Sequence, residues 1–256
     1  MKVYVINRKL MTRILMTILL LGITVIYTAG IENGMLSVFM NNNRKLPIYS
    51  VDVPEKKIAI SFDAAWGADK TEDILKILKE HNIKTTFFLV GFWVDNFPEM
   101  VKKISDEGHE VANHSAHHPK MSTLSKEQII KELNSTSEKI EAITGKPTTL
   151  LRPPFGDYNN NLIETAQELG YQVIQWDVDS LDYKDYGTQA IVDRVLKKVK
   201  NGSIVLFHNN ATYTPEALPL ILHELQKQGY GIVPISELIY KENYYIDHTG
   251  RQILLE

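Results

Sequence analysis

The sequence predicts an α/β fold in which parallel strands are joined by helices. Two observations lead to this prediction. Seven short runs rich in Val, Ile and Phe alternate with longer amphipathic stretches, and unusual polar residues follow directly after several of the runs. Strands that alternate with helices form parallel sheets through crossover connections. Two architectures satisfy the pattern, an open doubly wound sheet and a closed or nearly closed barrel.

The predicted strands are bounded by Gly, Asn or Pro and have a composition that strands favour. They comprise residues 58–62, 85–90, 110–112, 149–151, 172–176, 203–207 and 231–235. Apolar residues at helical spacing predict four helices between the strands. These lie around residues 74–78, 129–143, 191–199 and 218–225. Ser125 and Gln128 are placed as a capping box at the start of the second helix.

Polar residues that could do chemistry gather at one end of the predicted strands. They are Asp63, Asn113, His114, Arg152, the carboxylates between residues 177 and 182, and His208. In a parallel barrel these positions share the C-terminal rim, where active sites are built. No glycine-rich phosphate loop follows any strand, which removes the usual ligands of open sheets. The sequence therefore favours a site on a barrel rim.

The N-terminus has the pattern of an export signal. Four Lys and Arg residues precede or begin an uncharged apolar stretch over residues 14–31, which is just long enough to span a bilayer. A weak cleavage site favours an uncleaved signal anchor over a cleaved signal peptide, and both stay open. In either case we expect the body of the protein outside the cytoplasm. The predicted organisation is a signal anchor or signal peptide (1–31), a linker (32–54), a catalytic domain (55–240) and a C-terminal tail (241–256).

Composition excludes several classes of protein. The chain has 256 residues and 44% apolar content, enough for one sizeable core. Its formal net charge of −3 and the absence of basic runs argue against a nucleic-acid partner. There is no cysteine, so disulfides, thiolate zinc sites and cysteine nucleophiles are excluded.

Two histidines, His114 and His118, are candidate metal ligands. Their i and i+4 spacing can point both to one side of a helical turn, and imidazole suits zinc, cobalt, nickel or iron. An ordinary surface pair is the alternative. Their position directly after a strand, with Pro119 ending the turn, favours the ligand interpretation. His117 then points elsewhere.

Asp63 and Arg152 form a second candidate pair. Asp63 ends an apolar strand, where a carboxylate loses hydration and needs a partner. It is either a general base or an ordinary loop cap. Arg152 begins an Arg-Pro-Pro-Phe-Gly segment whose prolines stiffen the loop, and its planar guanidinium can hold a carboxylate in one orientation.

His208 follows the apolar strand at 203–207, where a lone histidine is often structural. Asp179 and Asp182 supply carboxylates on a neighbouring loop. A carboxylate beside imidazole raises its pKa and favours the imidazolium, which can donate a proton. His208 is therefore either a structural histidine or a general acid.

The order and spacing of these segments resemble the polysaccharide deacetylases that share the NodB homology domain, carbohydrate esterase family 4. All five motifs of that family can be placed between Ile58 and His208. The resemblance implies a distorted, TIM-barrel-like (β/α)7 barrel that removes N-acetyl groups from a cell-wall polysaccharide. It also implies that Asp63 is the catalytic base, Arg152 its partner, His114 and His118 the metal ligands, and His208 the general acid.

Further roles follow from the same resemblance. Asp179 matches the first Asp of an Asp-x-x-Asp-Trp motif and is similar to the residue that tunes the acid. Leu206 would line the acetyl pocket. Phe155, Tyr183 and Trp66 would contact the substrate, and a backbone N–H near Phe155 would stabilise the oxyanion.

Two positions depart from the family pattern. Ala64 stands where the family usually has a second Asp, a metal ligand, and alanine cannot coordinate. A divalent metal (zinc, cobalt or nickel) is then expected to bind weakly, because two neutral imidazoles must hold it almost alone. The second departure is Tyr183, which replaces the motif tryptophan and keeps an aromatic wall. The Phe-Asp-x-x-Trp-Gly form around Asp63 resembles the sporulation-associated branch of the family.

Three functional interpretations stay open. The first is a deacetylase of peptidoglycan or a related N-acetylglucosamine polymer, linked to sporulation and of low activity. The second is a catalytically silent glycan-binding protein of the wall or spore. The third is an O-acetyl polysaccharide esterase. The expected locations of the protein include the forespore or spore. The expected partners are a wall or spore glycan and the membrane, through the N-terminal segment.

Overall fold

A computed structural model describes residues 7–32 and 44–255 of the chain. The chain divides into two units, Met1–Arg44 and Lys45–Glu256. In the first unit, α1 (Arg8–Glu32) is a 25-residue helix. Over the described residues, no helix combines the length and apolar character needed to cross a membrane. Most of the predicted linker, residues 33–43, lies outside the described residues.

The second unit is built on a parallel sheet. Within the described residues its strands run in the order β6-β5-β4-β3-β2-β8-β7, with β9 also paired to β2, and every pairing is parallel. The strands are β2 (Lys57–Ala64), β3 (Thr86–Leu89), β4 (Glu110–Asn113), β5 (Leu150–Leu151), β6 (Gln172–Val173), β7 (Val178–Asp179), β8 (Ile204–His208) and β9 (Gly231–Val233). The sheet curls into a partial barrel whose open side lies between the edge strands β6 and β7. The α/β barrel prediction is confirmed.

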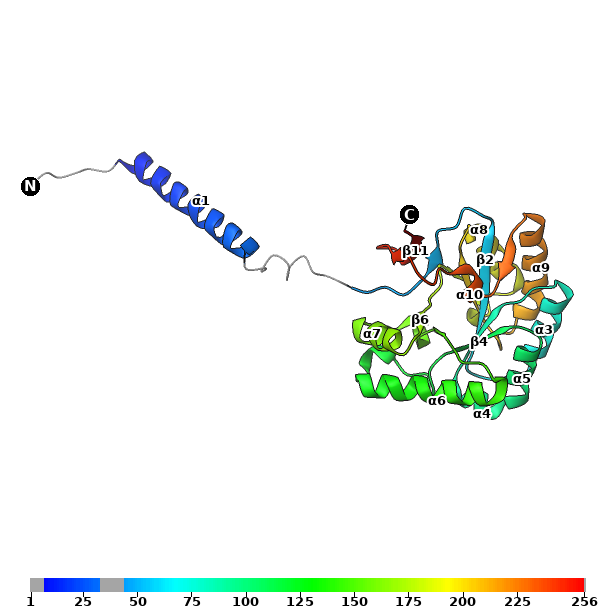
Figure 1. The fold of residues 1–256 in the computed structure, drawn as a ribbon. Coiled ribbons are helices and arrows are strands. Elements are labelled where there is room, and N and C mark those ends of the chain that lie inside the picture. Colours follow the sequence, from blue (N-terminus) through cyan, green and yellow to red (C-terminus); the bar gives the residue numbers. More distant parts are fainter. Residues whose placement is uncertain (1–6, 33–43, 256) are drawn as a thin grey trace, which may run out of the picture. The chain divides into compact units, whose positions relative to one another are not determined.

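Helices cover the outside of this sheet (Figure 1). They are α3 (Thr71–Glu80), α4 (Gly91–Asn96), α5 (Pro98–Asp106), α6 (Lys126–Thr144), α7 (Asn160–Glu168), α8 (Thr188–Lys198), α9 (Thr214–Lys227) and α10 (Ile235–Leu238), with 3-10 turns at Met121–Thr123, Pro154–Gly156 and Asp182–Lys184. The four predicted helices correspond to α3, α6, α8 and α9. The capping box of α6 is confirmed, because the Ser125 hydroxyl accepts from the backbone of Gln128 and the Gln128 side chain accepts from the backbone of Ser125.

Two apolar clusters lie on opposite sides of the sheet. Successive strand residues face opposite sides, so Phe87 packs under the outer helices against Phe62, with ring centroids 5.0 Å apart. Phe88 faces the barrel interior, in a cluster with Ala59, Leu150 and Ile174. Burial on both faces explains why the central strands are almost continuously apolar.

The compact unit is wider than the predicted 55–240 domain at both ends. Residues 46–51 pack on the sheet, with Ile48 and Val51 fully buried. A second, small sheet contains β1 (Ser50–Val51), β11 (Arg251–Leu254) and β10 (Tyr244–Ile246) in that order. Part of the predicted linker and the predicted tail therefore pair with each other, parallel between β1 and β11.

Candidate active site

A pocket of about 650 Å³ opens at the C-terminal ends of the strands. The strand register sets its floor, because Asp63 on β2 is the direct neighbour of His208 on β8. The residues that line the pocket are Asp63, Ala65, Trp66, His114, His118, Phe155, Trp176, Asp179, Tyr183, Asp185, Leu206, His208, Asn210, Ala211 and Thr212. The predicted gathering of polar residues at this rim is observed for Asp63, His114, Asp179 and His208. Asp177 is an exception, because its carboxylate accepts the Ser203 hydroxyl and the Ile204 N–H at the start of β8.

Asp63 is buried and makes an ion pair with Arg152. Its Oδ1 accepts a hydrogen bond from Nη1 of Arg152 at 2.8 Å, and its Oδ2 lies 3.5 Å from Nε2 of His114. Burial raises the pKa of Asp63, but the charges of Arg152, His114 and His208 outweigh that effect and lower it overall. Asp63 is thus a carboxylate at neutral pH, able to accept a proton.

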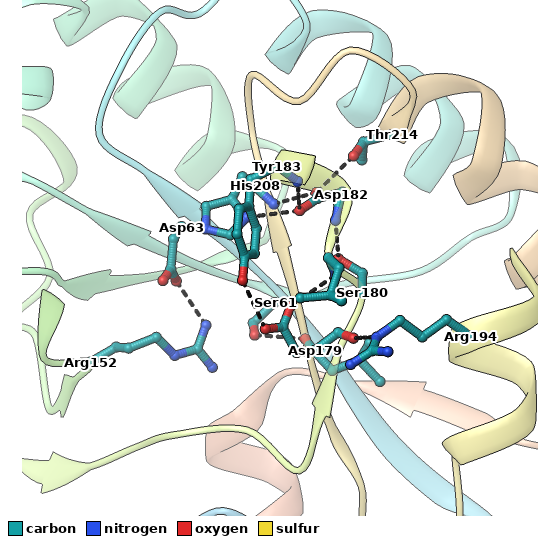
Figure 2. Close-up of polar contacts among 12 residues, drawn as sticks. Ser61, Asp63, Arg152, Asp179, Ser180, Asp182, Tyr183, Arg194, His208 and Thr214 are labelled. Carbon is teal, nitrogen blue, oxygen red and sulfur yellow. Dashed lines mark hydrogen bonds and ion pairs between the residues drawn. The ribbon is translucent and has the colours of Figure 1, made fainter. Parts of the chain in front are cut away.

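Arg152 is completely buried between the base and the barrel interior (Figure 2). Its guanidinium carbon lies 4.1 Å from the ring centroid of Phe88, and Nη2 donates to the backbone carbonyl of Gln175 at 3.2 Å. Burial lowers the Arg152 pKa while Asp63 raises it. The predicted stiff loop is observed as a 3-10 turn at Pro154–Gly156 that directly follows this side chain.

His208 is held by a buried carboxylate, that of Asp182. Oδ1 of Asp182 lies 2.8 Å from Nδ1 of His208, and Oδ2 accepts the His208 backbone N–H and the Thr214 hydroxyl, both at 2.7 Å. Burial lowers the His208 pKa, but the hydrogen bond and charge of Asp182 outweigh it, so the pKa is raised overall. His208 is therefore suited to donate a proton from Nε2.

Asp179 makes no hydrogen bond to His208, but its charge adds to that of Asp182 in raising the His208 pKa against the effect of burial. One of its carboxylate oxygens accepts the backbone N–H of Leu181, and the other accepts the Tyr183 hydroxyl at 3.3 Å. Leu181 has a left-handed backbone (φ 57°), and this turns the loop so that Asp182 points at His208 (Figure 2). The hydrogen bond to the His208 ring is thus made by Asp182, while Asp179 accepts the hydrogen bond of Tyr183.

The two predicted metal histidines come together, but not on a helical turn. Residues 114–119 form a loop in which Ser115 and His118 have positive φ values of 67° and 56°. The His114 and His118 rings still meet edge to face, 5.0 Å apart. Nδ1 of His114 lies 2.6 Å from the Arg152 carbonyl, so its Nε2 faces Asp63. Burial lowers the pKa of both, that of His118 to about 4, and both are neutral imidazoles.

Helix α6 holds this loop through Glu132. Its Oε2 accepts the backbone N–H groups of Ala116 and His117, each at 2.9 Å, and its Oε1 lies 2.7 Å from Nδ1 of His117. His117 is largely exposed and points away from the pocket, as expected. Glu132 was not singled out from the sequence, because a glutamate inside an amphipathic helix carries no distinguishing signal.

The residues present do not form a complete metal site. Within the described residues, no group of three or more His, Asp or Glu side chains is placed to hold an ion. Ala64 is fully buried in the outer apolar cluster and offers no donor atom. Asp63, the remaining carboxylate, is already paired with Arg152. The donor set is therefore two neutral imidazoles, and no chemical step is assigned to a metal.

Aromatic side chains form the rim on which a substrate could rest. Trp66 and Phe155 are mostly exposed, and both contact the His118 ring edge to face, at 5.0 and 4.5 Å. Tyr183 lies against His208 on the opposite side, 5.1 Å away. Leu206 also lines the pocket. Trp176 and Asp185 also line the pocket; neither was predicted, since only proximity in the fold marks them.

Asp63 and His208, on neighbouring strands and facing one pocket, have the arrangement in which a carboxylate could act as base and an imidazolium as acid in a hydrolysis. The sequence model of the polysaccharide deacetylase family matches residues 50–174. The peptidoglycan-N-acetylmuramic acid deacetylase PdaA of Bacillus subtilis is 36% identical over 76% of this chain and 75% of its own length. A peptidoglycan-N-acetylglucosamine deacetylase of Bacillus cereus is 38% identical over 72% and 89%. The chain therefore belongs to the polysaccharide deacetylase family.

Two further relatives are not described as active enzymes. The uncharacterized protein YlxY of Bacillus subtilis is 34% identical over 79% of this chain, which spans only 63% of YlxY. A solved structure described as a CE4 family pseudoenzyme from Bacillus anthracis is 37% identical, with a TM-score of 0.73 over 75% of this chain and 68% of that one. A mutant of that protein, described as having restored enzymatic activity, also has a TM-score of 0.73, with 38% identity over 75% and 70%.

Proposed function

We propose that this protein removes N-acetyl groups from a cell-wall polysaccharide, peptidoglycan or a related N-acetylglucosamine polymer, with low turnover. The observation that carries this proposal is that Asp63 and His208 face one pocket from neighbouring strands. Arg152 is paired with Asp63, and Asp182 with His208. The names of the relatives, which are peptidoglycan deacetylases, support the same substrate class.

In the proposed reaction, Asp63 accepts a proton from a water molecule, and the water oxygen adds to the acetamide carbonyl carbon. His208 donates a proton to the departing nitrogen as the C–N bond breaks, giving acetate and a free amine. Arg152 keeps Asp63 ionised and oriented. The aromatic rim of Trp66 and Phe155 would stack on a sugar ring.

Low turnover is proposed because the oxyanion of the addition step lacks a strong electrostatic partner. Stabilisation of a developing oxyanion is commonly the largest catalytic effect, with a single donor contributing about 100-fold or more. By the family resemblance, Ala64 stands where an Asp would complete a cation site with His114 and His118. A weakly bound zinc, cobalt or nickel ion stays part of this proposal, as does a contribution from the backbone near Phe155.

A second candidate function is a catalytically silent glycan-binding protein of the wall or spore. The same observation, Ala64 in place of a ligand, favours it, and a relative of similar fold is described as a pseudoenzyme. The aromatic rim and pocket would then retain the glycan without cleaving the acetamide.

Substitution of Ala64 by Asp tests the proposal, with Ala64→Asn as a neutral control of the same size. Acetate release from N-acetylated oligosaccharides and O-acetylated xylan would be measured with and without added zinc, alongside the metal content per chain. We expect slow release from N-acetylated substrate by the native protein. Ala64→Asp should bind about one metal ion and raise the rate about 100-fold, while Ala64→Asn should change neither.

Other outcomes select between the candidates. Glycan binding with no acetate release from the native protein would support the silent function. Release only from the xylan would identify an O-acetyl esterase. A native rate equal to that of Ala64→Asp would contradict the role given to Ala64, and absence of both binding and release in every variant would overturn the proposed function.

We also propose that the protein acts outside the cytoplasm, anchored by the apolar segment at residues 14–31, and that it serves sporulation. The basic residues before that segment support this orientation. Fractionation of cells that express the full chain tests the anchor. Recovery of the protein in the cytosolic fraction, rather than the membrane or wall fraction, would contradict it.

A further inference from the structure

The segment at residues 46–51 spans the open side of the barrel. Its N-terminal half pairs with the edge of the sheet at β6, where the Ile48 N–H donates to the Val173 carbonyl at 2.9 Å. Its C-terminal half reaches the start of β8, where the Val51 N–H donates to the Gly202 carbonyl at 2.9 Å. This segment, named here the seam segment, was predicted as part of a linker because a polar run precedes it and Pro47 and Pro54 interrupt the chain around it.

We infer that the seam segment is a positioning element of the active site, acting through Gln175 and Arg152. The Ile48 carbonyl accepts the Gln175 N–H at 2.7 Å, and the Gln175 carbonyl accepts Nη2 of Arg152 at 3.2 Å. Nη1 of Arg152 then donates to Asp63. Three consecutive hydrogen bonds therefore join the seam segment to the proposed base, whose role rests on the proposed function.

Gln175 depends on the seam segment because of its place between two anchored neighbours. Ile174 donates its N–H to Leu151 on β5, and Asp177 donates its N–H to Ile204 on β8. The Gln175 N–H is directed at Ile48 instead, and Gln175 is only 1% exposed. Water cannot easily replace a partner at such a buried amide, so displacement of Ile48 must move the Gln175 peptide.

Packing supplies a second connection between the two. Ile48 belongs to the interior apolar cluster that contains Phe88, and the Arg152 guanidinium lies over the Phe88 ring at 4.1 Å. Nε of Arg152 is buried without a hydrogen-bond partner. The side chain is thus oriented by two hydrogen bonds and by the rings of Phe88 and Trp176. The seam segment supports both the Gln175 bond and the cluster that contains Phe88.

Two glycines allow a matched test. A Cβ at Gly202 (φ 77°) would lie 1.7 Å from the Val51 carbonyl oxygen, so Gly202→Ala must push the seam segment away. A Cβ at Gly170 (φ 84°) meets nothing within 4 Å. Both substitutions place alanine at positive φ and share that backbone strain. Only Gly202→Ala displaces the seam segment.

The readout is the guanidinium 15N NMR signal of Arg152 in the full chain, assigned by its loss in Arg152→Lys. We expect Gly202→Ala to shift or broaden the Nη signals and Gly170→Ala to leave them unchanged. Acetate release, measured in the Ala64→Asp background, should fall about 10- to 100-fold in Gly202→Ala alone, with KM nearly constant. Unchanged Arg152 signals, together with a shifted amide signal of Val51, would overturn the inference.

A milder pair covers the case in which Gly202→Ala does not fold. Ile48→Val and Ile221→Val each remove one methylene from a buried residue, but Ile221 belongs to α9 and to the outer apolar cluster. Ile48→Val should move the Arg152 signals and Ile221→Val should not; equal effects would contradict the inference. The NMR measurement does not depend on turnover. If no variant releases acetate, the proposed function is overturned, but the Arg152 signals still test the positioning role of the seam segment.

Discussion

The Asp182 carboxylate makes two hydrogen bonds with His208. Its Oδ1 lies 2.8 Å from the ring Nδ1, and its Oδ2 accepts the backbone N–H at 2.7 Å. The contact raises the pKa of His208 above 6.5 despite the opposing effect of burial. In the folded protein the imidazolium is therefore favoured. Its stabilising contribution is fully present below about pH 6.5 and is lost as the pH rises through the folded-state pKa.

Asp182→Asn is expected to lower the pKa of His208, because it removes the charge that stabilises the imidazolium. The basic limb of the pH–rate profile should move to lower pH by about one unit or more. The unfolding free energy should fall most below pH 6.5, with the gap to the native protein narrowing at higher pH. Acetate release and urea unfolding across pH 5–9 measure both effects.

Asp185→Asn is the control for the Asp182 prediction. Asp185 lines the same pocket, but it does not bond His208. Its loss should leave the basic limb nearly in place. If the pH–rate profile moves equally in both variants, the total negative charge around the pocket, and not the contact with Asp182, sets the pKa of His208.

Asp63→Asn is expected to abolish acetate release while glycan binding persists. It keeps the shape of the side chain but leaves the buried Arg152 charge without an anion, which should cost about 3–5 kcal/mol of unfolding free energy. Because the pKa of Asp63 is lowered, the stability advantage of the native protein is present above about pH 4 and lost as the pH falls through the folded-state pKa.

A substitution on the surface calibrates the Asp63 result. Asp193 on α8 accepts one exposed hydrogen bond from Gln189, and Asp193→Asn should change the unfolding free energy by less than about 0.5 kcal/mol. Denaturant unfolding of both variants provides the comparison. A loss as small for Asp63→Asn as for Asp193→Asn would mean that the Arg152 pair is not the stabilising contact that its burial indicates.

Glu132→Ala is expected to loosen the loop at residues 114–119, which carries His114 and His118. It leaves the backbone N–H groups of Ala116 and His117 without their acceptor, at a cost of about 2 kcal/mol, and hydrogen exchange of residues 114–119 should accelerate. Glu138→Ala, at an exposed position of the same helix, should leave that exchange unchanged. Equal exchange in the two variants would contradict the role given to Glu132.

The sequence predicted the site at the level of strand ends but not of side-chain directions. Asp63 and His208 end apolar strands that must be parallel, so their meeting at one rim follows from the fold class. The choice between Asp179 and Asp182 depends on the left-handed backbone at Leu181, which no periodic pattern encodes. The loop at residues 114–119 is a similar case, since the i and i+4 spacing of its histidines is also typical of a helix.

The seam segment and the strands β7, β10 and β11 were not predicted, for a different reason. β7 has two residues, and the seam segment pairs with Val173 and Gly202, more than 100 positions away in the sequence. Such pairings leave no local signal, because hydrophobic periodicity needs a longer run to be recognised. Longer elements such as α6, with its capping box, are the ones that local sequence specifies.

Phe155 offers a test of the rim that separates ring from backbone. Its ring is 65% exposed and contacts His118 at 4.5 Å, and its φ of 60° is unfavourable for a side chain with a Cβ. Phe155→Ala should weaken glycan binding about 10-fold through loss of the ring, measured by calorimetry on N-acetylated oligosaccharides. Tyr186→Ala removes an equally exposed ring outside the pocket lining and should bind normally. If loss of the ring weakens binding, Phe155→Gly should lose as much affinity for the glycan as Phe155→Ala. If a change of the backbone at this position weakens binding, Phe155→Gly, which adopts positive φ without strain, should keep the native affinity.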